Sequence, residues 1–459
     1  MTANRYKGEK VLELKMDEFF ARMKALLVED YDRFLETVDK PAYKAIRVNT
    51  LKMQPEELIP LLSFAGEQVP FAEDGYYVSI EKLGKHPLHH AGAFYVQEPS
   101  AMSAVTALGV EPGDKVLDLC AAPGGKSTQI ASRLSGTGLL WANEIVRPRA
   151  HILLSNIERM GVKNAVVSNM SPDVLCPRLE GFFDKILVDA PCSGEGMFRK
   201  DKEAIFEWSV EHSLACAERQ KAILDSAALA LRPDGVMVYS TCTFSRDENE
   251  GVIEHFLLKH PEFELIDTGC RFGEPALGKA RRVYPFNGGE GHFFAKLRKK
   301  KGKSYRGGMY VHQEPDRDAR AAIDRFIADI LRNPNFRHLE VINDRILSYP
   351  NIELLPDMEG MNILRAGVKL GDFKKGRIEP HHNLATSLTP YEFKRRLIMN
   401  WDDELCARYI SGEELELDFW IEGWAVATVN GITLGLGKAV NGRFKNKYPK
   451  GLRTLAWKD

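Results

Sequence analysis

Residues 115–130, which read KVLDLCAAPGGKSTQI, decide the fold. The apolar run Val116–Leu119 carries Asp118 near its end, and a glycine turn and a polar stretch follow it. This order predicts a β-strand, a tight turn and an α-helix. A helix that begins directly after such a turn presents free backbone N–H groups, which suits a nucleotide-like cofactor.

Further apolar runs follow the glycine turn, over residues 139–143, 165–168, 185–188 and 236–240. Helices are expected between them, including one over 215–231, and another is expected to begin near Glu248. This alternation predicts βαβ units in an α/β protein with a doubly wound, Rossmann-like parallel sheet. The late run over 291–297 is expected to add an antiparallel edge strand.

The regions outside this core have other patterns. The first hundred residues show helical spacing of apolar residues over 12–27, a short strand over 45–51 and a helix after Pro55. The basic run Arg298–Arg306 indicates a linker, and the glycine- and valine-rich residues from Trp420 onward predict a small β domain. We therefore expect an N-terminal segment, a core, a linker with an intermediate domain, and a C-terminal β domain, over 1–104, 105–298, 299–385 and 386–459.

The composition limits the class of protein. With 459 residues, 44% of them apolar and 28% charged, the chain is typical of a soluble globular protein with several domains. No apolar run approaches the ~18–20 residues that span a bilayer, so we expect a cytoplasmic protein with no membrane contact. Seven scattered cysteines without a Cys-x-x-Cys pair indicate reduced thiols. The histidines also lack matching ligands, and we expect no metal.

The glycine turn has two interpretations. Gly124–Thr128 resembles the end of a phosphate-binding P-loop, which makes a P-loop NTPase one alternative. A P-loop, however, needs a glycine at the position that Cys120 occupies here. Glu144 follows the second predicted strand, where a carboxylate can accept hydrogen bonds from ribose hydroxyls. The turn therefore favours the adenosine part of S-adenosylmethionine, although glycines can also serve only to permit a tight turn.

Two cysteines stand fifty residues apart, each just after a predicted strand. Cys192 lies in the stretch Val188–Gly196, and Cys242 follows Tyr239–Thr241. Parallel strands place their carboxyl ends at one edge of the sheet, where open α/β sheets bind ligands. We therefore expect both thiols to share one pocket with the cofactor.

The C-terminal residues hold a run of cations without an intervening acid, namely Lys438, Arg443, Lys445, Lys447, Lys450 and Arg453. Phe444 and Tyr448 are interleaved with them. Clustered cations beside aromatic rings predict phosphate contacts combined with base stacking. A solvated loop is the alternative. Because the net charge is only −1, any binding of nucleic acid has to come from such local patches.

The chain resembles the Sun-type RNA cytosine carbon-5 methyltransferases, most closely their bacterial small-subunit rRNA methyltransferase F branch. The resemblance covers nearly the whole chain and rests on Arg47–Thr50, Gln97–Ser100, Asp118–Lys126, Asn143–Glu144, Asp189–Gly196, Ser240–Cys242 and a PUA-like end over Gly435–Arg453. It implies a monomeric, S-adenosylmethionine-dependent enzyme with a helical, RNA-facing N-terminal segment. It also implies that RNA, either 16S rRNA or the small ribosomal subunit, is the partner. A tRNA cytosine methyltransferase and an inactive RNA-binding assembly factor are the alternatives.

The resemblance also assigns roles. Carbon 5 of cytosine is a poor nucleophile, so a thiolate must first add to carbon 6. Cys242 is expected to attack and Cys192 to assist release, although DNA cytosine methyltransferases, by resemblance, use the Pro-Cys thiol and leave the reverse assignment open. Asp189 is expected to hydrogen-bond the cytosine ring, and Lys126 to favour the thiolate.

The expected cofactor residues surround the glycine turn and the ends of the following strands. They are Cys120, Ala121, Ala122, Pro123, Gly124, Gly125, Lys126, Glu144, Arg149, Asn169, Ser171 and Asp189. Ser171 departs from the family pattern, because related enzymes often carry an aspartate there that faces the adenine. Asn169 and Asp173 lie nearby in the sequence.

Overall fold

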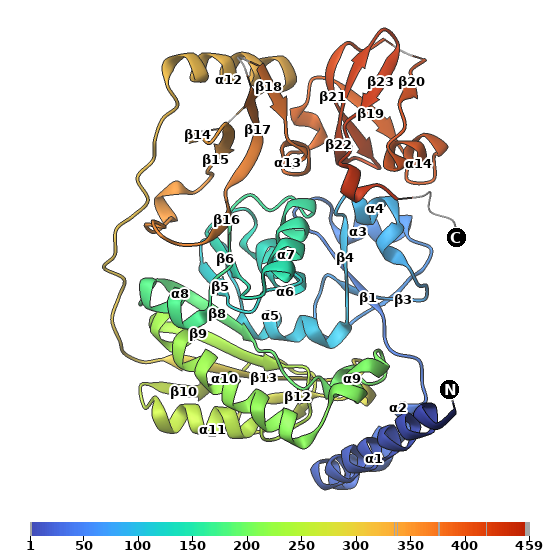
Figure 1. Ribbon diagram of the computed structural model, residues 1–459, viewed down its shortest axis with the longest axis vertical. Helices are drawn as coiled ribbons and strands as arrows, with labels where there is room; N and C mark the ends of the chain where they lie inside the picture. Colours follow the sequence, from blue (N-terminus) through green and yellow to red (C-terminus); the bar gives the residue numbers. More distant parts are fainter. Residues whose placement is uncertain (1, 335, 337, 375–376, 419, 455–459) are drawn as a thin grey trace.

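A mixed sheet forms the centre of the computed structural model, which describes residues 2–334, 336, 338–374, 377–418 and 420–454, without the side chains of residues 2–11 (Figure 1). Within these residues the sheet has ten strands. Its parallel part runs in the order β9, β8, β5, β6, β7. The strand bounds are Lys115–Asp118 for β5, Leu139–Asn143 for β6, Ala165–Ser168 for β7, Phe183–Asp189 for β8 and Leu231–Thr241 for β9.

Helices cover both faces of this sheet. Apolar residues of α5 (Ser103–Leu108), α6 (Gly125–Leu134) and α7 (Arg147–Arg159) pack on one face. Apolar residues of α8 (Pro172–Arg178), α10 (Val210–Ala230) and α11 (Glu250–Lys259) pack on the other. Strands buried on both faces need continuous apolar runs, which explains why they were legible in the sequence. The predicted doubly wound α/β core is confirmed.

The antiparallel strand predicted over 291–297 is present as β13 (His292–Lys299), paired with β9. It is not the edge of the sheet, however. β12 (Arg281–Val283), β11 (Glu274–Pro275) and β10 (Phe263–Ile266) extend the sheet beyond it. These strands are two to four residues long, too short to give a clear alternation in the sequence.

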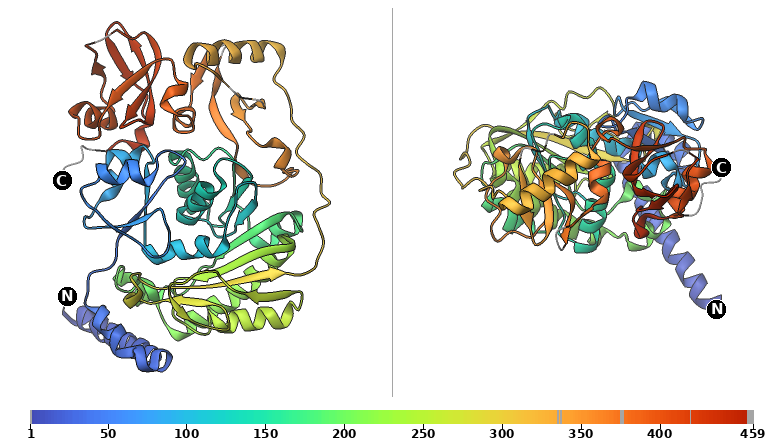
Figure 2. Two further views of the ribbon diagram at one scale, coloured as in Figure 1. Left: turned by 180° about the vertical axis from the view of Figure 1, so that it is seen from behind. Right: turned by 90° about the horizontal axis from the view of Figure 1, so that it is seen from above.

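The N-terminal residues combine helices with a small sheet. A helical hairpin, α1 (Thr2–Leu27) and α2 (Tyr31–Val38), lies at the periphery (Figure 2). It precedes a four-stranded antiparallel sheet in the order β2, β3, β1, β4, of which only β1 was expected. The strand bounds are Ala45–Val48 for β1, Ala65–Gln68 for β2, Gly75–Val78 for β3 and Phe94–Gln97 for β4. The helix expected after Pro55 is the short α3 (Pro55–Leu58), and α4 (Pro87–His90) precedes β4.

The segment expected as a linker and intermediate domain is joined to the core. After an extended stretch come α12 (Arg317–Ile330) and a four-stranded sheet of β14 (Leu339–Ile342), β15 (Arg345–Ser348), β17 (Val368–Lys374) and β18 (Arg377–Pro380). Between them β16 (Ile363–Ala366) pairs antiparallel with β7 and closes that edge of the core sheet. The prediction of a separate unit over 299–385 did not include this strand, which belongs to the core sheet. Residues 335, 337 and 375–376 of that segment lie outside the described residues.

The predicted C-terminal β domain is present on top of the N-terminal sheet (Figure 1). Its five described strands are β19 (Arg396–Met399), β20 (Leu415–Glu416), β21 (Gly423–Val429), β22 (Ile432–Val440) and β23 (Arg443–Asn446), preceded by α13 (His382–Thr386) and accompanied by α14 (Glu404–Ser411). Residues 419 and 455–459 of the expected domain lie outside the described residues. None of the described helices is long and apolar enough to cross a membrane.

Candidate active site

The two predicted thiols meet at the carboxyl ends of β8 and β9. These strands are parallel neighbours, and Cys192 and Cys242 lie in the loops that follow them. Their Sγ atoms are 3.2 Å apart. The structure therefore brings together two residues that are separated by fifty positions in the sequence. Cys176, Cys216, Cys270 and Cys406 are buried elsewhere, as expected for small apolar side chains.

Hydrogen bonds join the two thiol loops, which we define as residues 190–208 and 242–249. The Gly196 backbone N–H donates to the Cys242 carbonyl over 2.9 Å. Buried Glu195 accepts hydrogen bonds from the Thr243 hydroxyl and the Phe244 N–H, both over 2.9 Å. Buried Glu248, in turn, accepts one from the Ser193 N–H over 3.0 Å. Neither glutamate was recognised from the sequence, because their partners come from the opposite loop.

An ion pair lies beside the thiols. Lys126 Nζ is 2.7 Å from Asp189 Oδ2, and the Ser240 hydroxyl donates to Oδ1 over 2.8 Å. Burial would raise the pKa of the Asp189 carboxyl, but Lys126, His292 and these hydrogen bonds outweigh burial and lower it. Burial would likewise lower the pKa of Lys126, yet Asp189 raises it above its ordinary value. Both groups are thus held in their charged forms.

His292 is a further residue of this site that sequence reasoning missed. Its Nε2 lies 3.7 Å from Asp189 Oδ1, and neither ring nitrogen has a hydrogen-bond partner within the described part of the chain. Burial lowers the pKa of the imidazole to about 3, so the ring is neutral at physiological pH. Its only sequence signal was its position at the start of a strand beside β9.

The two cysteine thiols differ in their surroundings. The hydrogen bond with Cys242 and burial raise the pKa of the Cys192 thiol well above its ordinary value. Cys192 therefore stays protonated in this state and can donate its S–H hydrogen to the sulfur of Cys242.

The glycine turn connects β5 to α6 as predicted. Gly124 has φ = +113°, and a Cβ there would approach Leu153 Cδ1 to 3.2 Å. Buried Asp118 accepts a hydrogen bond from Ser127 over 2.6 Å, but its Oδ1 atom has no partner among the described residues. Burial raises the pKa of Asp118 to about 7. A buried carboxylate oxygen without a partner fits a cationic or hydroxyl-bearing ligand such as S-adenosylmethionine.

The next two strands add the remaining cofactor candidates. Glu144 is buried after β6; its Oε1 accepts the Val146 N–H over 2.8 Å, and its Oε2 lies 3.7 Å from Arg149 Nη1. Arg149 also donates to the Ala122 carbonyl over 3.0 Å, which joins it to the glycine turn. The Asn169 amide donates to the Glu144 and Ile145 carbonyls over 2.7 and 2.8 Å. Asn169 therefore fixes the backbone that carries Glu144.

The structure places Ser171 at the N-terminal end of α8, where its side chain caps no N–H group. Asp173 is exposed on that helix. The Asn362 amide, just before β16, donates to the Asn169 carbonyl over 3.1 Å. Residues of the C-terminal half thus reach the cofactor side of the core, which no local pattern had indicated.

A pocket of about 480 Å³ lies between the N-terminal sheet and the glycine turn. Among the described residues its lining reaches Asp189 but includes neither thiol, so the expected pocket shared by both thiols and the cofactor is not present as one cavity. The N-terminal sheet forms one wall with Tyr95, Gln97 and neighbours. The glycine turn and the ion pair form the other, with Cys120, Ala121, Ala122, Pro123, Gly125, Lys126 and Asp189. Exposed Lys44, Lys82 and Lys200 also line the pocket, together with Glu81 and Glu98, and Lys44 pairs with Glu81 over 2.6 Å. This shape can admit a planar ring next to Asp189.

In the structure, the C-terminal basic run has buried aromatic residues and nearby acids, which its sequence did not indicate. Phe444 and Tyr448 are 0% and 1% exposed, so the expected base stacking on these two rings is wrong. Acids from other segments also approach the cations: Arg443 lies 3.4 Å from Glu414, and Lys447 lies 3.6 Å from Glu379. Strand alternation turns Phe444 into the core and leaves its neighbours outside.

Family models match almost the whole chain. The model described as 16S rRNA methyltransferase RsmB/F matches residues 105–298. Three others match the N-terminal domain of 16S rRNA methyltransferase RsmF over 16–99, the RsmF rRNA methyltransferase first C-terminal domain over 325–388, and the Methyltransferase RsmF PUA domain over 396–454.

Individual proteins agree with these models. The chain is 33% identical over 462 residues to ribosomal RNA small subunit methyltransferase F of Vibrio vulnificus, covering 95% of this chain and 97% of that protein. The corresponding protein of Shewanella oneidensis is 33% identical, with coverages of 92% and 93%. Among solved structures, NSun6 from Pyrococcus horikoshii with SFG has a TM-score of 0.57 and 26% identity over 62% of this chain and 98% of its own. A methyltransferase homologue from Pyrococcus horikoshii has a TM-score of 0.54 and 32% identity, over 61% and 93%.

Proposed function

The chain belongs to the 16S rRNA methyltransferase RsmB/F family, and from this premise we propose that it methylates carbon 5 of a cytosine in small-subunit rRNA. The donor is S-adenosylmethionine, and a covalent cysteine adduct at carbon 6 is the intermediate. The observation that carries this proposal is the pair of Sγ atoms, 3.2 Å apart, beside the Lys126–Asp189 ion pair. The names of the relatives favour rRNA over tRNA.

The cofactor fits the residues around the glycine turn. Asp118 offers a carboxylate oxygen without a partner among the described residues, and Glu144 offers a buried carboxylate after the next strand. The NSun6 structure with SFG, an analogue of S-adenosylmethionine, supports the same cofactor for this fold. When bound, S-adenosylmethionine supplies an electrophilic methyl group.

The chain's own residues then activate the base. Cys242 Sγ forms a bond to carbon 6, which makes carbon 5 nucleophilic. Asp189, held ionised by Lys126, accepts a hydrogen bond from the exocyclic amino group of the cytosine and orients the base. After methyl transfer, the carbon-5 proton leaves to a base and the bond between carbon 6 and Sγ breaks. The Cys192 thiol, 3.2 Å away, assists release by donating a hydrogen bond to the departing thiolate.

RNA has to reach this pocket from outside, and the target base has to leave its stack. We assign this task to the exposed Lys82 and Lys200 of the pocket lining and to the C-terminal domain. There Lys438 and Lys447 lie 6.0 and 5.8 Å from the ring centroid of Trp424. Lys445 on β23 is the cross-strand neighbour of Lys438 on β22. Trp424 and these lysines replace Phe444 and Tyr448 as the proposed RNA surface.

The two thiols can be tested separately with 16S rRNA transcribed in vitro. Cys192→Ala should still attack and should accumulate a protein–RNA complex that survives denaturing electrophoresis. Cys242→Ala should bind RNA yet give neither adduct nor 5-methylcytosine in bisulfite sequencing. A stable adduct in Cys242→Ala but not in Cys192→Ala would reverse the roles. Methylation that persists without an adduct in any variant would reject the two-thiol mechanism.

A further inference from the structure

The helical hairpin α1–α2 packs against both thiol loops. The Phe19 ring of α1 lies 5.0 Å from Phe198, in the loop that follows Cys192, and 6.5 Å from Phe244, in the loop that follows Cys242. It also contacts Trp208 edge-on at 6.2 Å. One buried side chain of the hairpin therefore touches rings anchored on both loops.

Trp208 links this contact to the network that joins the loops. Its Nε1 donates to Glu195 Oε1 over 3.0 Å, while Glu195 Oε2 holds the Thr243 hydroxyl and the Phe244 N–H. The position of the Phe19 ring is thus transmitted through Trp208 and Glu195 to the backbone directly after Cys242.

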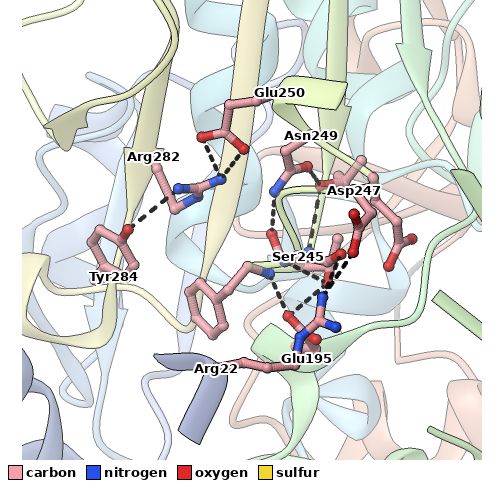
Figure 3. A network of polar contacts seen from close by, with 12 residues as sticks. Arg22, Glu195, Ser245, Asp247, Asn249, Glu250, Arg282 and Tyr284 are labelled. Carbon is pink, nitrogen blue, oxygen red and sulfur yellow. Dashed lines mark hydrogen bonds and ion pairs between the residues drawn. The ribbon is translucent and has the colours of Figure 1, made fainter. Parts of the chain in front are cut away.

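A polar contact of the hairpin acts on the same loop. Figure 3 shows Arg22 reaching Ser245 and Asp247 beside Glu195. Arg22 Nη2 is 3.0 Å from Asp247 Oδ2 and 3.3 Å from Ser245 Oγ. Just after the loop, Arg282 Nη2 donates to both carboxylate oxygens of Glu250 over 2.9 and 2.8 Å. The loop after Cys242 is therefore held in its middle by the hairpin and followed by a residue that Arg282 holds.

Ser245 continues the contact toward the other thiol. Its hydroxyl is 2.8 Å from Ser213 Oγ, which donates to Glu248 Oε1 over 2.8 Å. Glu248 accepts the N–H of Ser193, the residue after Cys192. A continuous chain of hydrogen bonds thus runs from Arg22 on the hairpin to the backbone beside the second thiol.

We propose that the α1–α2 hairpin sets the separation of the two catalytic thiols, with Phe19 and Arg22 as positioning residues. This inference rests on the proposed two-thiol chemistry. Its physical basis is that a displacement of about 1 Å at reacting atoms can cost up to ~100-fold in rate. The cofactor residues lie on or after β5, β6, β7 and β8 and none of them belongs to the two thiol loops, so the hairpin should leave cofactor binding unchanged.

The test uses full-length protein and an oxidation rate that requires neither RNA nor cofactor. A diazene oxidant such as diamide takes one electron and one proton from each thiol, becomes the hydrazine, and leaves a Cys192–Cys242 disulfide that peptide mass spectrometry quantifies. Phe19→Ala should slow this reaction about tenfold or more, and Arg22→Ala about two- to fivefold, because its ion pair is partly exposed. Phe19→Leu, which keeps apolar volume, serves if Phe19→Ala does not fold.

Phe263→Ala is the matched control, because Phe263 on β10 is as buried as Phe19, at 4% exposed. It should oxidise within about twofold of the parent, and all variants should bind S-adenosylmethionine with the parental Kd. The adduct is measured in proteins that also carry Cys192→Ala. There, adding Phe19→Ala should slow adduct formation by about the same factor by which Phe19→Ala slows disulfide formation when both thiols are present. Unchanged oxidation in Phe19→Ala and Arg22→Ala would overturn the inference, as would an unchanged rate in Phe19→Leu and Arg22→Ala if Phe19→Ala does not fold. Absence of an adduct in the unaltered background would instead reject the proposed function.

Discussion

The two halves of the site differ in how completely their polar groups are paired. Around the thiols, Glu195 accepts hydrogen bonds from both loops, and Glu248 accepts them from Ser193 of one loop and from Ser213 and Gln220 of α10. Around the glycine turn, Asp118 retains an oxygen without a partner in the described structure, and its pKa is raised to about 7 by burial. Carboxylates whose oxygens are all paired keep their geometry without a ligand, whereas a buried carboxylate with an unpaired oxygen gains most when a ligand arrives.

Because of this difference, substitutions in the two halves should affect different measured quantities. Changes in the thiol half should alter the rate of the reaction and leave the affinity for S-adenosylmethionine intact. Changes in the cofactor half should alter that affinity first. Each of the following experiments can contradict this separation between effects on rate and effects on cofactor affinity.

Replacement of Asp189 should have the largest effect. Asp189→Asn removes the charge that pairs with Lys126 and leaves only a neutral amide oxygen as the acceptor proposed for the cytosine. We expect kcat to fall about a hundredfold to ten-thousandfold, with the Kd for RNA nearly unchanged. Single-turnover methylation measures the rate, and filter binding measures the Kd. If the substitution lowered only the affinity for RNA, Asp189 would have no role in the chemical step.

The pH dependence of cofactor affinity should follow Asp118. A cationic ligand prefers the ionised carboxylate, so binding below the raised pKa of about 7 must release a proton. The affinity for S-adenosylmethionine should therefore rise up to about tenfold per pH unit as pH approaches 7, then level off. Calorimetry between pH 5.5 and 8.5, in buffers of different ionisation enthalpy, checks both predictions. Asp118→Asn should give a flat profile; a slope equal to that of the parent would exclude Asp118.

Glu144 should contribute a smaller part of cofactor affinity. Loss of a charge-assisted hydrogen bond costs roughly 1.5–3 kcal/mol, so Glu144→Ala should raise the Kd for S-adenosylmethionine about tenfold or more. Glu144→Gln keeps an acceptor and should lose less. Glu218→Ala, an exposed carboxylate on α10, is the control. Unaltered affinity in a folded Glu144→Ala protein would remove this residue from the cofactor site.

The smallest expected effect belongs to the C-terminal lysines. Lys445, Lys447 and Lys450 are exposed, and neutralising all three should flatten the dependence of log K on log salt by up to ~0.7–0.9 per lost phosphate contact. Cofactor affinity should not change. An identical salt slope would indicate that this patch makes no phosphate contact. Trp424→Leu tests separately whether its ring adds stacking energy.

The sequence predicted the parts of the fold that depend on local pattern. Val116–Leu119 and Val236–Ser240 are strands buried on both faces, so their apolar runs were continuous, and parallel order then placed Cys192 and Cys242 at one edge. Partners from distant segments were not predictable. Glu248 has no local partner in its own stretch, and β16 has only four residues and pairs with a strand about 195 residues earlier. Phe444 was misread because the run of neighbouring cations hid the strand alternation that buries it.

The pairing of β16 with β7 also has a consequence for synthesis on the ribosome. Residues 165–168 are made first, and the strand that covers their open edge is added about 195 residues later. At ~5–20 residues per second, this edge stays unpaired for about 10–40 s in each nascent chain. An uncovered strand edge is a template for pairing with other chains. Termination anywhere before residue 363 therefore releases a catalytic sheet that is open on one side, so the final third of the chain protects the core as well as enlarging the molecule.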